Sequence, residues 1–399
     1  MPCGSVAKVF GAFLKLGLTS FGGPIAHVGY FHREFVERRR WVDEAHYAQL
    51  LALSQFLPGP ASSQVGFSLG IIRAGWLGGL AAFVAFTLPS ALLMFAFAYL
   101  TPRLDRPYGQ ALLHGFKLVA VAVVAHGVVT MAQRLTPDAR RIVLALLAAA
   151  AVLWSHTAIV QIGVVIAGAI GGLLLCRHAT ATVGTTFDIR YGTRVGIALL
   201  VVFGALLVIA LWPDSDPNAL PSAAKAFYRT GALVFGGAHV VLPLLEEAVV
   251  RPDWVSASDF FAGYGAAQAV PGPMFSLAAF LGARLEFASS STVGAVVALL
   301  AMFLPGLLLA AGVLPLWNLI TRRPAAASAL AGINAAVVGL LAAALYDPVI
   351  KTAVVSPLDL AIAGIGFALL IFKRTGVLWV LLWCVSASLT RVALGTAAA

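Results

Sequence analysis

Long apolar stretches decide what class of fold this chain can adopt. Residues 76–100, 157–176 and 195–212 approach or exceed the ~20 residues that an α-helix needs to cross the hydrocarbon core of a bilayer. Hydrophobic residues make up 61% of the chain and charged residues 11%, which excludes a soluble globule and a disordered protein. The apolar stretches do not alternate as strands do. We therefore expect an all-α, polytopic membrane protein.

The chain also contains two related halves. FGGPIAHVGYFHREFVERRRW (21–41) precedes QFLPGP (55–60) in the first half, and FGGAHVVLPLLEEAVVRPDW (235–254) precedes QAVPGP (268–273) in the second. The interval between matched positions changes by a single residue from the first pair of segments to the second. Matched glycine, proline and tryptophan residues at a nearly constant interval predict an internal duplication. We assign residues 1–133 to a first repeat, 134–224 to connecting transmembrane helices and a linker, 225–346 to a second repeat, and 347–399 to C-terminal transmembrane helices.

Charge indicates how the repeats are oriented. Basic clusters lie at residues 33–40, 134–141, 177–194, 322–323 and 373–374, whereas residues 214–225 and 246–253 are acidic or neutral by comparison. With the basic loops on the cytoplasmic side, segment 76–100 runs outward and its repeat partner 292–317 runs inward. We therefore expect inverted-topology repeats, an arrangement that many secondary transporters use.

Each half contains helical segments too short to cross a bilayer alone. We expect residues 5–36 and 44–72, and likewise 226–250 and 257–285, to form re-entrant hairpins that enter and leave on one side, with a Pro-Gly-Pro break at the tip of one hairpin in each half. Broken backbone at membrane depth is tolerated where protein buries it or water wets it, because each unsatisfied group in hydrocarbon costs several kcal/mol. The breaks therefore predict a polar centre, although a bend made for packing is the alternative.

A new helix is expected to begin after each break. Pro60 and Pro273 suit a first helical turn, where serine hydroxyls follow. A helix start exposes amide donors and about half a positive charge, so several converging starts suit a small dianion. The residues assigned to this site are Gly22, Gly23, Pro24, Gln55, Pro58, Gly59, Pro60, Ser62, Ser63 and Gln64 in the first repeat, Gly236, Gly237, Gln268, Pro271, Gly272, Pro273 and Ser276 in the second, and Lys117 with its repeat counterpart Asn334.

Lys117 joins this set because it lies within an apolar stretch, where a lysine is expensive and therefore a functional candidate. A structural ion pair and a snorkelling side chain are the alternatives. For proton coupling the titratable candidates are His27, Glu34, His239 and Glu246. Pairing with Arg38–Arg40 is the alternative for Glu34, and a solvated outer face is the alternative for Glu246.

Other chemistries lack support in the sequence. Cys3, Cys176 and Cys384 lie far apart without histidine at ligand spacing, so we expect no metal site and no disulfide framework. No phosphate-binding loop, dinucleotide fingerprint or nucleophile constellation is visible, which argues against an ATP-driven pump, a cofactor-dependent oxidoreductase and a lipid-handling or other membrane enzyme. The net charge of +10 does not indicate nucleic-acid binding, because no basic patch lies on a soluble module.

The motifs FGGPIAHVGYFHREFVERRRW, LSQFLPGPASSQ, FGGAHVVLPLLEE and GYGAAQAVPGP resemble the chromate ion transporter family in its long, two-domain form. The resemblance implies a multi-pass carrier in the inner (cytoplasmic) membrane that exports chromate, driven by the proton-motive force, and so confers chromate resistance. It also implies interaction with sulfate, the other tetrahedral dianion. Ala238 stands where relatives often carry a third glycine. A sulfate or other oxyanion carrier remains the alternative, membrane lipid is the expected surrounding, and a homodimer is left open.

Overall fold

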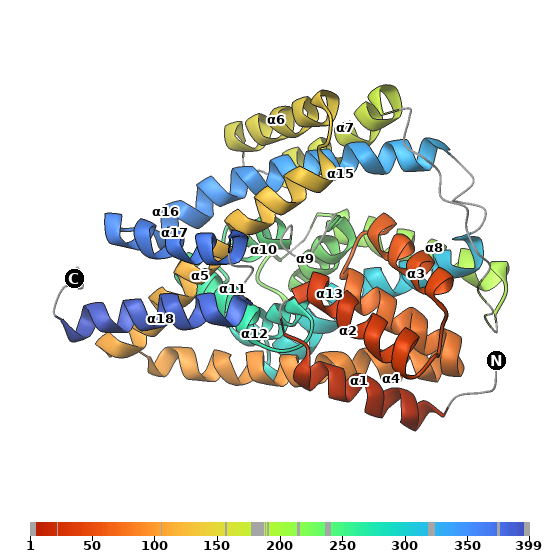
Figure 1. The fold of residues 1–399 in the computed structure, drawn as a ribbon, viewed down its shortest axis with the longest axis horizontal. Helices are drawn as coiled ribbons and strands as arrows, with labels where there is room; N and C mark the ends of the chain where they lie inside the picture. Colours follow the sequence, from red (N-terminus) through yellow and green to blue (C-terminus); the bar gives the residue numbers. More distant parts are fainter. Residues whose placement is uncertain are drawn as a thin grey trace.

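A computed structural model describes residues 5–21, 23–104, 106–155, 158–176, 187, 189, 191–213, 216–235, 241–317, 324–372 and 376–394. These residues form helices joined by short turns, which confirms the all-α prediction (Figure 1). Five helical segments within this part are long and apolar enough to cross a bilayer: Ala61–Leu100, Pro107–Leu135, Thr193–Leu211, Ser291–Leu316 and Ala327–Ala353. The chain is therefore a multi-pass membrane protein.

The helices follow the same order in both halves. The first half contains α1 (Val6–Thr19), α2 (Gly23–Phe31), the π-helix η1 (His32–Arg38), α3 (Glu44–Phe56), α4 (Ala61–Leu100), η2 (Thr101–Arg103), α5 (Pro107–Leu135), α6 (Ala139–Trp154), α7 (Ala158–Leu175) and the linking helix α8 (Thr193–Leu211). The second half contains α9 (Leu220–Leu233), α10 (Val241–Val249), α11 (Ala257–Ala269), η4 (Met274–Ser276), α12 (Leu277–Ala283), α13 (Ser291–Val313), η5 (Leu314–Leu316), α15 (Pro324–Ala344), the π-helix η6 (Leu345–Ile350), α16 (Lys351–Ala353), α17 (Pro357–Ile371) and α18 (Val377–Ala393).

The chain reverses inside α4, where Ala74 and Gly75 leave the helical conformation. A Cβ on Gly70 would lie 2.4 Å from the carbonyl oxygen of Gly78. Eight residues of straight helix would separate these positions by about 12 Å, so the two parts of α4 must fold back on each other. The second repeat makes the same crossing, because a Cβ on Gly282 would lie 2.3 Å from the oxygen of Gly294. The Pro-Gly-Pro hairpins are therefore re-entrant, as predicted.

Two π-helices coincide with single-residue changes in the interval between the repeats. The interval is shorter by a single residue at Trp41 and Trp254 than at the Phe-Gly-Gly motifs, and η1 lies in that stretch of the first repeat. A second step follows later in the chain. The interval between the N-cap residues of α6 and α17 is longer by a single residue than the interval between the starts of α5 and α15, and η6 lies between these positions in the second repeat. A π-turn accommodates one extra residue within a helix, so η1 absorbs the first insertion without breaking the helix. In η6 the backbone leaves the helical conformation at Asp347, so the second insertion is accompanied by a kink.

The two repeats are inverted, as the charge pattern predicted. Trp76, at the start of the second part of α4, stacks on Tyr191 with ring centroids 4.7 Å apart, and the Tyr191 hydroxyl donates to the carbonyl oxygen of Ala311 near the end of α13. At the opposite end of α4, Phe97 lies 5.5 Å from Phe280 of α12, which precedes α13. The helices α4 and α13 therefore run antiparallel. We call the side of Trp76 the first face and the side of Phe280 the second face.

The outer helices of each half pack on the inner helix of the other half. Helices α6 and α7 cover α15, while α17 and α18 cover α5. Glycines allow these close contacts: a Cβ on Gly172 would lie 2.3 Å from the oxygen of Ser328, and one on Gly115 would lie 2.7 Å from the Cα of Val385. The pairs α6–α7 and α17–α18 thus occupy equivalent places in the chain order. The repeat boundaries at residues 133 and 346 stay a prediction.

Candidate functional site

The two Pro-Gly-Pro turns meet the opposite repeat in the centre of the molecule. The backbone N–H of Gly59 donates to the carbonyl oxygen of Val234 (2.7 Å), and that of Gly272 donates to the carbonyl oxygen of Ser20 (2.9 Å). Ser20 and Val234 are equivalent residues, since each follows the last turn of the first helix of its repeat. Two equivalent hydrogen bonds thereby join the hairpin tips of one repeat to those of the other in two pairs.

Both turns require glycine. Gly59 has φ 118° and Gly272 has φ 100°, values that residues with a Cβ rarely adopt. A Cβ on Gly59 would lie 3.0 Å from the Cα of Gly306, and one on Gly272 would lie 3.0 Å from the Oγ of Ser90. Ser90 and Gly306 each follow the proline inside the long helix of the other repeat. Each Pro-Gly-Pro turn therefore packs against the residue that follows a proline in the long helix of the other repeat.

The start of α4 forms the polar side of this centre. Pro60 is the N-cap residue of α4 and Pro273 that of η4, so both prolines lie one residue before the first turn rather than within it. A proline cap has no side-chain oxygen, so the first amides of α4 remain available to another acceptor. Ser62 and Ser63 are buried there, and in the part of the chain described the Ser63 hydroxyl has no hydrogen-bond partner.

His27 ties the first hairpin to this helix start. Its Nε2 lies 3.1 Å from the carbonyl oxygen of Ser20 and its Nδ1 lies 3.3 Å from the Ser62 hydroxyl. The neutral tautomer that carries its proton on Nε2 fits both contacts, because it donates to the carbonyl and accepts from the hydroxyl. The ring packs edge-on against Phe86 at 5.2 Å. Ser20 itself is fully buried, and its hydroxyl is unpartnered among the described residues.

The remaining predicted binding residues occupy different environments. The Gln64 amide nitrogen donates to the oxygens of Pro58 (2.7 Å) and Gly306 (3.2 Å), whereas the amide nitrogen of Gln268 contacts the Met274 sulfur at 2.7 Å. Gln55 is exposed. The structure buries Pro271 and Ser276 beside the second turn and places Gly23 and Pro24 at the start of α2. Gly22, Gly236, Gly237 and His239 lie outside the described residues.

Lys117 and Asn334 lie farther along the inner helices. Lys117 is half-buried in α5, with the carboxylate of Asp259 on α11 within electrostatic range. Asp259 also forms an ion pair of 2.9 Å with Arg284. The Oδ1 atom of Asn334 is buried and has no partner within the residues that the structure describes. Neither side chain joins the hydrogen bonds described above at the hairpin tips, and the role of both stays a prediction.

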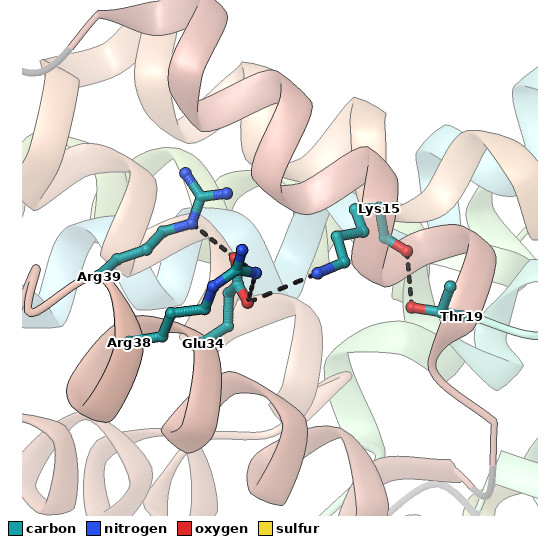
Figure 2. A network of polar contacts seen from close by, with 5 residues as sticks. All are labelled: Lys15, Thr19, Glu34, Arg38 and Arg39. Atoms are coloured by element: carbon teal, nitrogen blue, oxygen red, sulfur yellow. Dashed lines mark hydrogen bonds and ion pairs between the residues drawn. The ribbon is translucent and has the colours of Figure 1, made fainter.

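Glu34 lies near the first face and is held by three cations (Figure 2). Its carboxylate is 2.6 Å from Arg39 Nε, 3.1 Å from Arg38 Nη1 and 3.9 Å from Lys15 Nζ. Burial raises the pKa of this carboxyl, but the hydrogen bonds and charges of these cations outweigh it and hold the pKa below its usual range. The ion pairs that were the alternative for Glu34 are therefore present. The second repeat keeps an equivalent pair, Glu247–Arg251, at 2.7 Å.

Glu246 has the electrostatics of a titratable switch. Burial, together with the charges of Glu247 and Asp347 and against the opposing charge of Arg251, raises the pKa of its carboxyl to about 7. The side chain lies on α10, a short helix outside the membrane-spanning segments. A carboxyl with a pKa near neutrality gains and loses a proton in the physiological range. Its role in proton coupling stays a prediction.

Sequence reasoning missed several residues of the centre. Ser20, Ser90 and Gly306 were not predicted, although the matched segments TLPSALL and FLPGLLL contain the last two. Position within a repeat could have indicated Ser90 and Gly306, since both follow a proline inside a long apolar stretch. Ser20 carries no such signal, because a serine beside a Phe-Gly-Gly turn is an ordinary turn residue.

Comparisons with known proteins agree with this architecture. The family model "Chromate transporter" matches residues 7–173 and again residues 222–389, one match in each half. A probable chromate transport protein of Synechococcus elongatus is 30% identical over 86% of this chain and 84% of its own length. Chromate transport proteins of Pseudomonas aeruginosa (28% identical, 87% and 82% covered) and Cupriavidus metallidurans (27%, 83% and 80%) are also similar.

No solved structure matches the chain. The relatives are named as transport proteins, which supports the expectation of a carrier rather than an enzyme. The two segments matched by the family model correspond to the inverted halves of the fold. The paired matches and the similarity over most of the chain establish that this protein belongs to the chromate transporter family.

Proposed function

We propose that this protein carries chromate across the membrane and binds it where the four hairpin tips meet. The observation that carries the proposal is the pair of reciprocal hydrogen bonds, Gly59 to Val234 and Gly272 to Ser20, which hold the tips of both repeats around one centre. Inverted repeats with interrupted helices at the membrane midplane form the substrate sites of many secondary transporters. The names of the relatives supply the substrate.

The chemistry of the centre suits a tetrahedral dianion. The start of α4 presents amide donors and about half a positive charge. The buried hydroxyls of Ser20 and Ser63 have no partner within the described structure, so each keeps a donor for a ligand. Amides and hydroxyls bind an oxyanion without a full counter-charge and release it readily, which a carrier requires. Sulfate has the same charge and shape, so an oxyanion carrier that prefers sulfate is the alternative.

We further propose that transport is outward and coupled to protons, with chromate resistance as the result. Arg33, Arg38, Arg40 and Arg73 lie near the first face, which the positive-inside rule places in the cytoplasm of a bacterial inner membrane. Glu246 supports coupling, since it lies between the centre and the second face on a helix that leaves the tip of its hairpin. Proton uptake there from outside would accompany chromate release.

Everted membrane vesicles containing the protein test the proposal with radiolabelled chromate, with and without an uncoupler. We expect uptake that the uncoupler abolishes and that excess sulfate reduces. A Ser63→Ala variant is expected to take up chromate poorly, whereas Ser54→Ala, whose hydroxyl donates to Leu51 in its own helix, serves as the matched control. Uptake that the uncoupler does not change would contradict proton coupling. Uptake of sulfate without uptake of chromate would favour the sulfate carrier.

A further inference from the structure

The two repeats differ in how their third helices pack. Helix α11 packs along α5, and a Cβ on Gly265 would lie only 1.9 Å from the carbonyl oxygen of Phe116. By the repeat interval, the equivalent of Gly265 is Ala52 on α3 and that of Phe116 is Ile333 on α15. No comparable packing of α3 on α15 exists within the described residues, and the two helices lie apart in Figure 1. Equivalent surfaces are thus in contact on one side and separated on the other.

The face of α3 that would make this contact is open. Glu44, Ala48 and Gln55 are exposed along one stripe of the helix, and Ala52 within that stripe is half-buried. On α11 the equivalents of Ala48, Ala52 and Gln55 are Phe261, Gly265 and Gln268, and all three are buried. The side chains that face lipid elsewhere are large and apolar, such as Leu77 and Leu92. A stripe of alanines that begins with a glutamate and ends with a glutamine is a surface for water or for another helix.

The closed contact lies between the centre and a pocket on the second face. That pocket is lined by Tyr99, Trp254, Asp259 and Arg284, among others. Along α11, Asp259 lies at the pocket, Gly265 at the contact with α5, and Gln268 at the central turn. Along α11, the contact therefore lies between the pocket and the central turn. On the first face the equivalent contact is open, so Gln55 at the tip of α3 is exposed while Gln268 is 7% exposed.

We propose that Gly265 and Ala52 are twin gate residues that close in turn. In the present state Gly265 docks on Phe116 and shuts the second face. In the alternate state the unit of α5, α15 and their outer helices moves, Ala52 docks on Ile333, and the first face shuts. The internal symmetry supports this, since one sequence pattern already forms the closed contact in one of its two copies. The inference rests on the proposed carrier function and assigns its gates.

Small residues are essential to both contacts. Gly265 has no space for a Cβ in the closed state, and a large side chain at Ala52 would hold α3 away from α15. A bulky substitution at either position therefore removes one of the two states. Gly265→Leu is expected to favour the state that is open to the second face, and Ala52→Leu the state seen here. Gly11→Leu is the matched control, because nothing lies within 4 Å of a Cβ at Gly11.

The experiment measures which face of the membrane each tip can be labelled from. Gln55→Cys or Gln268→Cys is introduced singly into a chain in which Cys3, Cys176 and Cys384 are replaced by alanine, and an impermeant maleimide is applied to right-side-out and everted vesicles. We expect Gln268→Cys to label from the second face about tenfold faster with Gly265→Leu than without it, a change equivalent to about 1.4 kcal/mol. Gln55→Cys should label from the first face equally fast with and without Ala52→Leu.

Chromate uptake is measured in separate vesicles whose chains carry Gly265→Leu, Ala52→Leu or Gly11→Leu with Gln55 and Gln268 intact. Both leucine variants are expected to lose uptake, and Gly11→Leu is expected to keep it. Unchanged labelling of Gln268→Cys with Gly265→Leu, or normal uptake by Ala52→Leu, overturns the gate assignment. If Gly265→Leu does not reach the membrane, the Ala52→Leu result decides. If Gly265→Leu shifts the labelling but the parent chain does not transport chromate, the gates are supported and the proposed substrate is rejected. If the parent transports chromate normally but the labelling does not shift, the substrate is supported and the gates are rejected.

Discussion

Gln64 joins the two repeats through a hydrogen bond of 3.2 Å from its side-chain amide to the carbonyl oxygen of Gly306. The same nitrogen donates to the carbonyl oxygen of Pro58 at 2.7 Å, so one buried amide fixes the first Pro-Gly-Pro turn against helix α13. The equivalent residue of the second repeat is Leu277, also fully buried. The two turns therefore have different partners although their sequences match.

Gln64→Leu should lower both stability and chromate uptake. The substitution leaves two buried carbonyl oxygens without this donor, and each unsatisfied group costs about 1–3 kcal/mol. Thermal unfolding in detergent and uptake in vesicles measure the effect. Gln161→Leu is the control, because Gln161 is also a buried glutamine but lies on a different helix, α7. Equal losses in both variants would mean that Gln64 acts as an ordinary buried amide.

Gly59→Ala and Gly272→Ala should each destabilise the protein and reduce transport. Alanine at positive φ costs roughly 1–2 kcal/mol, and the new methyl group would also press on the opposite repeat. Gly29→Ala is the control, since a Cβ there meets nothing within 4 Å. Melting temperature and uptake are measured for all three. A Gly59→Ala variant that behaves like Gly29→Ala contradicts the requirement for glycine in the turn.

Ser63→Ala and Ser20→Ala should weaken chromate binding without loss of stability. A buried hydroxyl without a partner contributes no hydrogen bond to the fold, so its removal is neutral or stabilising. Each hydroxyl that donates to the anion should instead change the KM for chromate by about tenfold. Initial uptake rates over a range of chromate concentrations, together with melting temperatures, separate the two effects. A lower melting temperature with an unchanged KM would show that the hydroxyls are structural.

Glu246→Gln should change how stability depends on pH. The pKa of Glu246 is raised in the folded protein from 4.5 to about 7, so its protonated form is favoured by folding. The wild type therefore keeps this contribution below pH 4.5 and loses it as the pH rises through 7. Glutamine stays neutral, so the variant should gain in melting temperature over the wild type between about pH 5 and pH 8. A constant difference across that range would contradict the raised pKa.

The sequence contained enough information for the fold. The Pro-Gly-Pro breaks and short apolar segments predicted the re-entrant hairpins, and the basic clusters predicted the inversion, because both follow from the physics of a backbone in a bilayer. The drift of the repeat interval was visible as well. The cause of its single-residue steps was not, since the insertion of one residue could lengthen a loop. The structure shows instead that η1 absorbs one residue within a helix and that a kink at Asp347 in η6 accompanies another.

The centre was predictable in part. The turns around Gly59 and Gly272 were identified, but their partners Val234 and Ser20 were not, because contacts between repeats depend on how two distant hairpins meet. The pairing of Glu34 with Arg38 and Arg39 could be proposed from the sequence, but the third cation, Lys15, comes from a neighbouring helix. The difference between Gln55 and Gln268 could not be predicted at all, since twin sequences do not specify which of two states is occupied.

The exchange of outer helices between the halves has a consequence for biogenesis. During synthesis α5 is made long before α17 and α18, which cover it in the folded protein. In the same way, α6 and α7 are made before α15, on which they pack. Glycines such as Gly115 and Gly172 then face lipid in the nascent chain. Assembly is therefore completed only when the ribosome has finished the last helices, and a truncation after α8 leaves the amino-terminal half without the neighbours that mature packing supplies.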